Sequence, residues 1–160
     1  MIVQHSLKPV FDKKSKVLIL GSLPSVKSRS EGFYYAHPQN RFWKIIETIF
    51  NVKLNTIEDK TQFLLSSHIA LYDVIESCEI NGSSDSSIKD VIPTNLSDII
   101  NQSEIEHIFI NGKKAFDLYN KYQYPNVKIK AVLLPSTSAA NAMYSLNRLI
   151  EDYQQIKELL

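Results

Sequence analysis

The chain has 160 residues, 44% of them apolar and 22% charged, and a formal charge of +1 at pH 7. These values are typical of one globular domain and exclude disordered, collagen-like and coiled-coil proteins, and the near-zero charge gives no sign of a nucleic-acid partner. The lone Cys78 excludes an internal disulfide and an iron–sulfur cluster, and the four histidines are scattered. We therefore expect no metal and no cofactor. Because we find neither a signal-like start nor an apolar run of membrane-spanning length, we expect a cytoplasmic protein, and a monomer.

The charge is unevenly distributed along the chain. Residues 1–44 contain eight Lys and Arg residues against two acidic residues, a net charge of +6, so the remainder carries −5. The average therefore conceals a basic segment, which we expect to produce a positive field at one edge of the folded domain.

Short β-branched runs alternate with longer amphipathic segments, which is the pattern of strands and helices around a buried parallel sheet. Four short apolar runs are expected to form strands, at residues 17–20, 69–74, 107–110 and 127–134. The first shows no alternation with polar residues, which suits a strand buried on both faces. Helices are expected at residues 40–50, 57–66, 113–122 and 141–159, with a short one capped by Thr94 or Asn95. Residues 81–87 form the most loop-like stretch, which is too isolated to divide the chain. We therefore interpret residues 1–160 as a single α/β domain.

Ligands of such sheets bind outside the carboxyl ends of the strands, where three loops fall, at residues 21–41, 73–87 and 135–141. The first loop begins Gly-Ser-Leu-Pro-Ser, at residues 21–25. Gly21 lets the backbone approach a ligand closely, and the two serines offer hydroxyl groups. The segment is neither a Walker loop nor a nucleophile elbow. An ordinary strand-to-helix connection and a binding loop both remain open.

The same loop continues with aromatic side chains interleaved with polar ones: Phe33, Tyr34, Tyr35, His37, Asn40 and Arg41. This mixture suits a planar base that stacks on a ring and is held at its edges. We expect Phe33 or Tyr35 to face the ligand, and the alternative is that two of the three aromatic rings belong to the core.

Three hydroxyl residues, Ser136, Thr137 and Ser138, follow the last expected strand and precede the last expected helix. Hydroxyls and unpaired amides at a helix start suit a phosphate, whereas capping of the helix would explain only one of the three.

Together these segments resemble the uracil-DNA glycosylase superfamily, and within it the hypoxanthine-DNA (deoxyinosine) glycosylase branch. Four segments carry the resemblance: Gly-Ser-Leu-Pro-Ser (21–25), Tyr-Tyr-Ala-His-Pro-Gln-Asn-Arg-Phe-Trp (34–43), Ala-Leu-Tyr-Asp-Val-Ile with Gly-Ser-Ser-Asp-Ser-Ser-Ile (70–75 and 82–88), and Leu-Pro-Ser-Thr-Ser-Ala-Ala-Asn (134–141). The resemblance implies a three-layer α/β/α fold around a four-stranded parallel sheet. It also implies a monofunctional DNA-repair glycosylase that flips a deaminated base, hypoxanthine or uracil, out of DNA and hydrolyses its glycosidic bond, leaving an abasic site.

The resemblance also implies roles for individual residues. Asn40 is the water-positioning or sugar-side catalytic residue, with Ser22 as a nearby helper. Four residues are expected around the flipped base, with the ring of Tyr35 stacked on it: Gly21, Phe33, Tyr35 and His37. Five are expected at DNA phosphates: Ser25, Ser136, Thr137, Ser138 and Asn141. Leu134 stands where the best-known uracil enzymes place a histidine, so we expect no histidine-assisted, uracil-specific mechanism. Preorganised neutral donors can stabilise the departing base without such a residue.

Other functions remain open at this point. One is a mismatch-specific uracil-DNA glycosylase, and another is a nucleic-acid-binding domain of the same fold without catalysis. A nucleotide-hydrolysing or phosphate-binding protein is a more distant alternative. The sequence also does not rank hypoxanthine, uracil and xanthine, because a few donors at the base edge decide between them.

Overall fold

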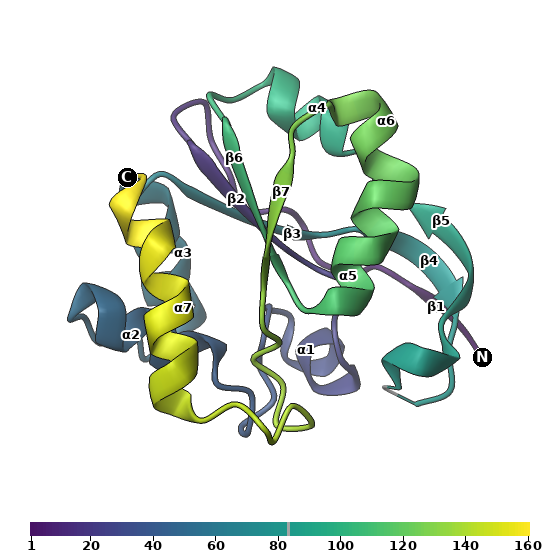
Figure 1. The fold of residues 1–160 in the computed structure, drawn as a ribbon, viewed down its shortest axis with the longest axis horizontal. Coiled ribbons are helices and arrows are strands. Elements are labelled where there is room, and N and C mark those ends of the chain that lie inside the picture. The colour runs from purple at the N-terminus through teal and green to yellow at the C-terminus, as the bar shows by residue number, and fades with distance from the viewer. Residues whose placement is uncertain (83) are drawn as a thin grey trace.

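Helices flank both faces of a central sheet in the computed structural model, which describes residues 1–82 and 84–160 (Figure 1). The sheet contains four parallel strands in the order β3 (Ile69–Asp73), β2 (Val17–Gly21), β6 (His107–Asn111) and β7 (Ala131–Leu134). One face is covered by α2 (Phe42–Phe50), α3 (Ile57–Ser66) and α7 (Leu146–Glu158), and the other by α4 (Leu96–Asn101), α5 (Lys113–Leu118) and α6 (Tyr124–Val127). The predicted α/β/α fold is confirmed.

Strand β2 lies at the centre of the sheet, and all five of its residues are buried. Val17 and Ile19 face the core formed with α2, α3 and α7, whereas Leu18 and Leu20 face the core formed with α4 and α5. Successive side chains of a strand point to opposite faces, so a strand covered on both sides needs an unbroken apolar run. This requirement explains why β2 could be predicted from the sequence.

A second sheet, which the sequence pattern did not predict, lies beside the first. It is antiparallel, in the order β1 (Ile2–Gln4), β4 (Ile75–Glu79) and β5 (Lys89–Pro93). Val3 of β1 pairs with Cys78 of β4, and both side chains are buried in one core cluster. A strand of three residues whose partner lies 75 residues further along the chain leaves no local pattern to read. The sheet matters for function because it holds the N-terminal segment against the end of β3.

Several element boundaries differ from the predicted ones. Helix α7 begins at Leu146 rather than near residue 141, because the Ser145 hydroxyl caps it by accepting a hydrogen bond from the Arg148 amide at 3.2 Å. Strand β7 begins at Ala131 rather than at residue 127, because the helical segment that starts with α5 continues through a π-helical turn (Tyr119–Gln123) into α6. Of the two expected caps of α4, Asn95 is the residue used.

The loops at the carboxyl end of the sheet contain short helical elements of their own. Helix α1 (Val26–Glu31) lies within the loop that follows β2, and a 3-10 turn (Asp85–Ser87) lies within the loop that follows β4. Position 83, in the predicted loop 81–87, falls outside the described residues.

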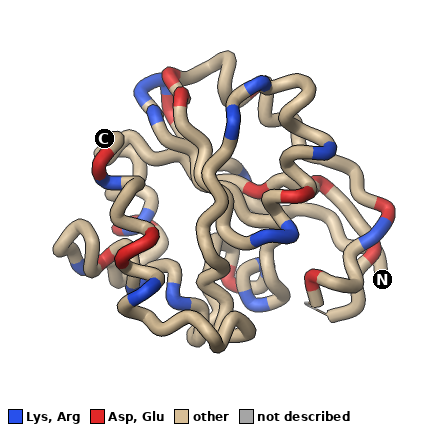
Figure 2. Tube along the Cα trace, in the orientation of Figure 1, with Lys and Arg blue, Asp and Glu red and all other residues tan. Residues whose placement is uncertain are grey.

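The basic residues of the N-terminal segment are divided between the two ends of the sheet. Lys13, Lys14 and Lys16 precede β2 and so lie at its amino end, whereas Lys27 and Arg29 belong to α1 at the carboxyl end. Figure 2 shows Lys and Arg interspersed with Asp and Glu around the molecule. The expected concentration of positive charge at one edge is therefore wrong.

Candidate active site

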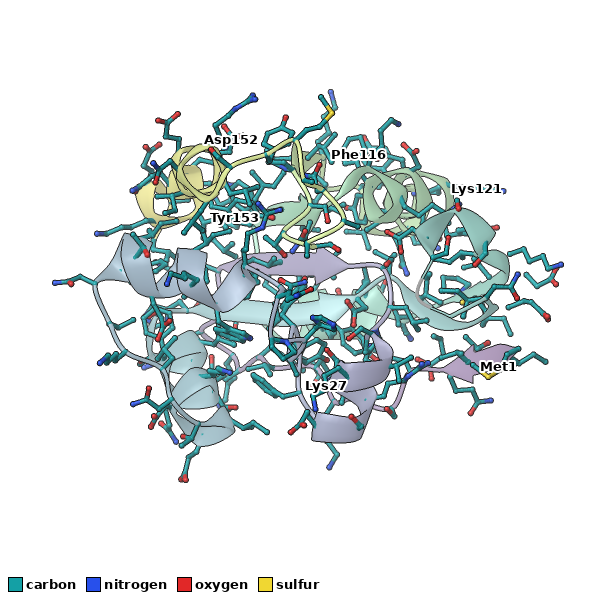
Figure 3. All side chains as sticks on the ribbon, turned by 90° about the horizontal axis from the view of Figure 1, so that it is seen from below. Met1, Lys27, Phe116, Lys121, Asp152 and Tyr153 are labelled. Carbon is teal, nitrogen blue, oxygen red and sulfur yellow. The ribbon has the colours of Figure 1, made fainter. Side chains whose placement is uncertain are left out.

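A cavity of about 970 Å³ lies at the carboxyl end of the parallel sheet. Each of the four strands contributes its last residue to the lining, in the sheet order Asp73, Gly21, Asn111 and Leu134. Figure 3 shows the molecule from below, with Tyr153 of α7 above the strands in the view and Lys27 of α1 below them. All three predicted loops contribute to the lining, as expected for a site outside the carboxyl ends of the strands.

The side chain of Asn40 is held by two hydrogen bonds that leave its amide nitrogen free. Its Oδ1 accepts from the Phe42 amide at 3.0 Å and from the Thr137 hydroxyl at 2.8 Å. A backbone N–H can only donate, so the bond from Phe42 fixes which end of the Asn40 side chain is oxygen. Nδ2 has no partner among the described residues, and Asn40 lines the cavity. Two N–H donors in a fixed position are therefore available to a ligand.

Thr137 links Asn40 to Asn111 through a fully buried hydroxyl. Its Oγ1 donates to Asn40 and accepts from Asn111 Nδ2 at 2.9 Å, and its amide donates to Asn111 Oδ1 at 3.0 Å. The predicted contact of the Thr137 side chain with a phosphate does not fit this burial, and the geometry makes Thr137 a positioning residue instead. The sequence pattern did not single out Asn111 as a site residue, although Asn111 ends a buried strand as Gly21 does.

Tyr35 and Asp73 meet above Gly21 at the floor of the cavity. A Cβ on Gly21 would lie 2.8 Å from Asp73 Oδ1 and 3.0 Å from the Tyr35 hydroxyl, so only glycine leaves room here. Burial and the negative charge of Asp73 raise the pKa of Tyr35, and a smaller effect of Asn111 lowers it. The net shift is upward, so the phenol keeps its proton. One face of the ring stacks on Phe42, with centroids 4.1 Å apart. Tyr35 lines the cavity, so the predicted stacking role requires the opposite face of its ring.

Arg41 fixes the loop that follows β7. Its guanidinium donates hydrogen bonds to four backbone carbonyls, those of Thr137, Ser138, Asn141 and Tyr144. The backbone amide of Arg41 also donates to the Thr137 carbonyl, at 3.0 Å. A guanidinium engaged by four carbonyls is not free for a phosphate, so Arg41 acts by holding the loop in one conformation.

The cavity also carries ionisable groups of both signs: Asp73, Asp85, Asp152, Arg29 and Lys113. Burial raises the pKa of Asp85, while the charge of Lys114 and the hydroxyl of Ser22 act to lower it. The cavity therefore combines neutral hydrogen-bond donors with charged side chains. A carboxyl group beside Ser22 is also a feature that the sequence pattern alone did not indicate.

A sequence model described as the Uracil DNA glycosylase superfamily matches residues 8–158. The chain belongs to this superfamily. It is 31% identical over 150 residues to a protein named hypoxanthine DNA glycosylase from Methanosarcina acetivorans, with 92% of this chain and 94% of the relative covered. A protein of the same name from Methanosarcina barkeri is 31% identical over 141 residues, with 86% and 88% covered. The solution structure of a candidate uracil DNA glycosylase from M. acetivorans is similar with a TM-score of 0.81 and 30% identity, covering 98% of this chain and 99% of that one.

Two of the residues expected around the base, Phe33 and His37, lie outside the cavity at the carboxyl end of the sheet. Phe33 is buried in the core, where it stacks on Trp43 with centroids 5.9 Å apart, and it is not among the lining residues. His37 is exposed, and its Nδ1 accepts from the Gln39 amide at 3.1 Å in the turn before α2. The geometry therefore brings Gly21 and Tyr35 to the cavity and leaves Phe33 and His37 outside it.

The residues expected at phosphates lie around the cavity, but most also serve the local backbone. Ser25 caps α1, since its hydroxyl accepts from the Ser28 amide at 3.1 Å. Ser136 accepts from the Ser138 amide and Ser138 from the Ala140 amide, each at 3.2 Å, which leaves both hydroxyl protons free to donate. Asn141 donates from Nδ2 to the Ser136 carbonyl at 3.0 Å. Because α7 begins only at Leu146, this loop does not offer the unpaired amides of a helix start.

Within residues 1–82 and 84–160, no three His, Cys, Asp or Glu side chains are grouped so as to hold a metal ion. Nor does any helix there have the length and apolar character needed to cross a bilayer. The predicted absence of a cofactor remains a prediction.

Proposed function

We propose that this chain is a monofunctional DNA N-glycosylase that removes hypoxanthine, and other deaminated bases with the same edge, from DNA. The observation that carries this assignment is the amide of Asn40, held with its N–H donors free in a cavity of a size suited to a small ligand. Membership of the superfamily and two relatives named hypoxanthine DNA glycosylase support it.

In the proposed reaction, the bond from C1′ to the base nitrogen breaks and both electrons leave with the base. Water then forms the new bond to C1′, and the proton that it loses ends on the departing base. Asn40 Nδ2 donates a hydrogen bond to the attacking water, which leaves a lone pair of the water oxygen free to attack C1′. The Ser22 hydroxyl is a second contact of this water. Carboxylates that line the cavity, Asp85 among them, stabilise the positive charge that develops on the sugar.

The proposed DNA contacts lie along the loop that Arg41 holds. Ser136 and Ser138 donate their free hydroxyl protons to phosphates, and Ser25 and Asn141, which line the same cavity, add to this contact. We also propose that the enzyme acts as a monomer and as a single domain. Its location in the cytoplasm stays a prediction.

Release of hypoxanthine is tested with oligonucleotides that carry one deoxyinosine, deoxyuridine or deoxyxanthosine, alongside undamaged strands. We expect alkali-labile abasic sites at deoxyinosine and intact undamaged strands. Cleavage at deoxyuridine alone would favour a uracil glycosylase, and intact strands throughout would favour a binding domain without catalysis.

Met143 is the residue we propose to fill the space left by the flipped base. Its side chain is 91% exposed, in the loop that Arg41 fixes and next to Tyr144 of the cavity lining. Apolar side chains of this kind insert between base steps. Met143→Ala is expected to slow base release from duplex DNA about tenfold, but to leave release from single strands near the wild-type rate, because an unpaired base needs no wedge. Equal losses on both substrates, measured in single turnovers, would argue against this role.

A further inference from the structure

Two polar atoms at the floor of the cavity form a donor and an acceptor side by side. The Tyr35 hydroxyl and Asp73 Oδ1 both stand above Gly21, 3.0 and 2.8 Å from the position of its absent Cβ. The hydroxyl is buried without a hydrogen-bond partner among the described residues, and Oδ1 likewise has none in that part of the chain. Buried polar groups of native proteins are normally paired, so an unpaired donor beside an acceptor in a binding cavity calls for a ligand that pairs with both.

His5 fixes the orientation of the Asp73 carboxylate. His5 Nε2 lies 2.8 Å from Asp73 Oδ2, and the two side chains are 1% and 4% exposed. The other ring nitrogen, Nδ1, accepts from the Leu7 amide at 3.2 Å, so in the neutral imidazole Nε2 carries the hydrogen and donates it to Asp73. The His5 ring also packs against Tyr72 in a T-shaped arrangement, with centroids 4.8 Å apart. Oδ2 is thereby occupied, and Oδ1 is the oxygen left to accept from a ligand.

Deamination changes one edge of a base in a way that matches such a pair. In adenine and cytosine, a ring nitrogen with a lone pair lies beside an amino group. In hypoxanthine and uracil, the same positions hold a ring N–H beside a carbonyl. This edge is opposite the glycosidic bond, so a base that enters the cavity from DNA presents it to the floor.

We propose that Tyr35 and Asp73 read the deaminated edge: the Tyr35 hydroxyl donates to the carbonyl oxygen, and Asp73 Oδ1 accepts from the neighbouring ring N–H. This edge contact replaces the stacking role expected of Tyr35, because the phenolic hydroxyl lies in the plane of its ring and cannot reach the edge of a base stacked on the ring face. His5 is the positioning residue for Asp73. This inference rests on the proposed function and extends it to the base-reading groups. Against adenine or cytosine, the carboxylate of Asp73 faces the lone pair of a ring nitrogen, and the two repel each other. The floor therefore separates hypoxanthine from adenine and uracil from cytosine.

The experiment compares the affinities of two oligonucleotides, one with hypoxanthine and one with adenine, each on a 2′-fluoro sugar that blocks cleavage. We expect wild-type protein to prefer hypoxanthine by about tenfold or more. In Asp73→Asn the amide oxygen stays with His5 and the NH₂ group faces the base, which replaces the acceptor by a donor. This variant is expected to lose the preference or to reverse it.

Two further variants separate base reading from general stability. Tyr35→Phe removes only the hydroxyl and is expected to weaken hypoxanthine binding about three- to tenfold, whereas Tyr119→Phe, outside the cavity, serves as the matched control. His5→Leu is expected to reduce the preference as Asp73→Asn does, and His5→Gln, which keeps a donor, to restore most of it. A purely structural role of His5 would lower the affinity for both oligonucleotides alike.

An unchanged preference for hypoxanthine in folded Asp73→Asn and Tyr35→Phe would overturn this inference, while release of hypoxanthine by the wild-type protein would leave the proposed function standing. Conversely, failure of the wild-type protein to release any deaminated base would overturn the proposed function. If Asp73→Asn does not fold, an unchanged preference in Tyr35→Phe is enough to overturn the donor half of the pair.

Discussion

Replacing Asn40 with alanine is expected to slow base release in single turnovers by about a hundredfold or more, the scale at which loss of one preorganised donor acts. The substitution removes the Nδ2 donors that the two bonds to Oδ1 hold in the cavity. It also leaves the Phe42 amide without its acceptor at the start of α2, at a cost of about 1 kcal/mol to the free energy of unfolding. Rates are therefore compared well below the unfolding temperature of the variant.

Two other variants make this result specific. Asn40→Asp keeps the acceptor for Phe42 and Thr137 but replaces the donor by a second oxygen, so we expect it to be about as slow as the alanine variant. Asn120→Ala changes an exposed asparagine outside the cavity and should retain the wild-type rate. A rate for Asn40→Ala within threefold of wild type would remove Asn40 from the catalytic assignment.

The second large effect is expected from Arg41→Lys. A lysine ammonium is a point charge and cannot reproduce a planar group that donates to four carbonyls at once. We expect the free energy of unfolding to fall by about 2–4 kcal/mol, which lowers the melting temperature by roughly 5–15 °C. Because the same loop carries Thr137, which positions Asn40, base release should slow more than tenfold.

Amide hydrogen exchange measures the loop directly. The amides of Asn141 and Tyr144 are hydrogen-bonded within the loop, and they should exchange faster in Arg41→Lys than in the wild-type protein. Arg148→Lys is the matched control, since Arg148 packs over the Tyr144 ring at 4.5 Å and leaves the carbonyls untouched. Unchanged exchange in Arg41→Lys would show that the guanidinium does not hold the loop.

The parallel sheet could be predicted from the sequence because burial on both faces demands an uninterrupted apolar run, and β2 and β6 each have one. Helix α3 matches its predicted limits of residues 57–66, with Thr56 as the cap. These elements depend on residues close together in the chain. The sheet formed by β1, β4 and β5 joins strands that are far apart in the chain, so it could not be predicted from a local sequence pattern.

The same distinction applies to the candidate site. Asn40 and Gly21 could be assigned because their motifs resemble those of a known superfamily, and the geometry brings both to the cavity. The pairing of His5 with Asp73 joins residues 68 positions apart and could not be read from either segment. Thr137 was assigned to phosphates because hydroxyl residues before a helix favour such contacts, but its burial depends on where Asn111 and Asn40 lie.

Chromatography of the free base tests the central claim most directly. Wild-type protein and Asn40→Ala are each mixed in excess with a duplex that contains one deoxyinosine, and released hypoxanthine is quantified beside the abasic strand. We predict equal amounts of hypoxanthine and abasic sites from the wild-type protein, and little of either from Asn40→Ala over the same time. Strand loss without free hypoxanthine, or equal release by both proteins, would contradict hydrolysis of the glycosidic bond at the cavity that Asn40 lines.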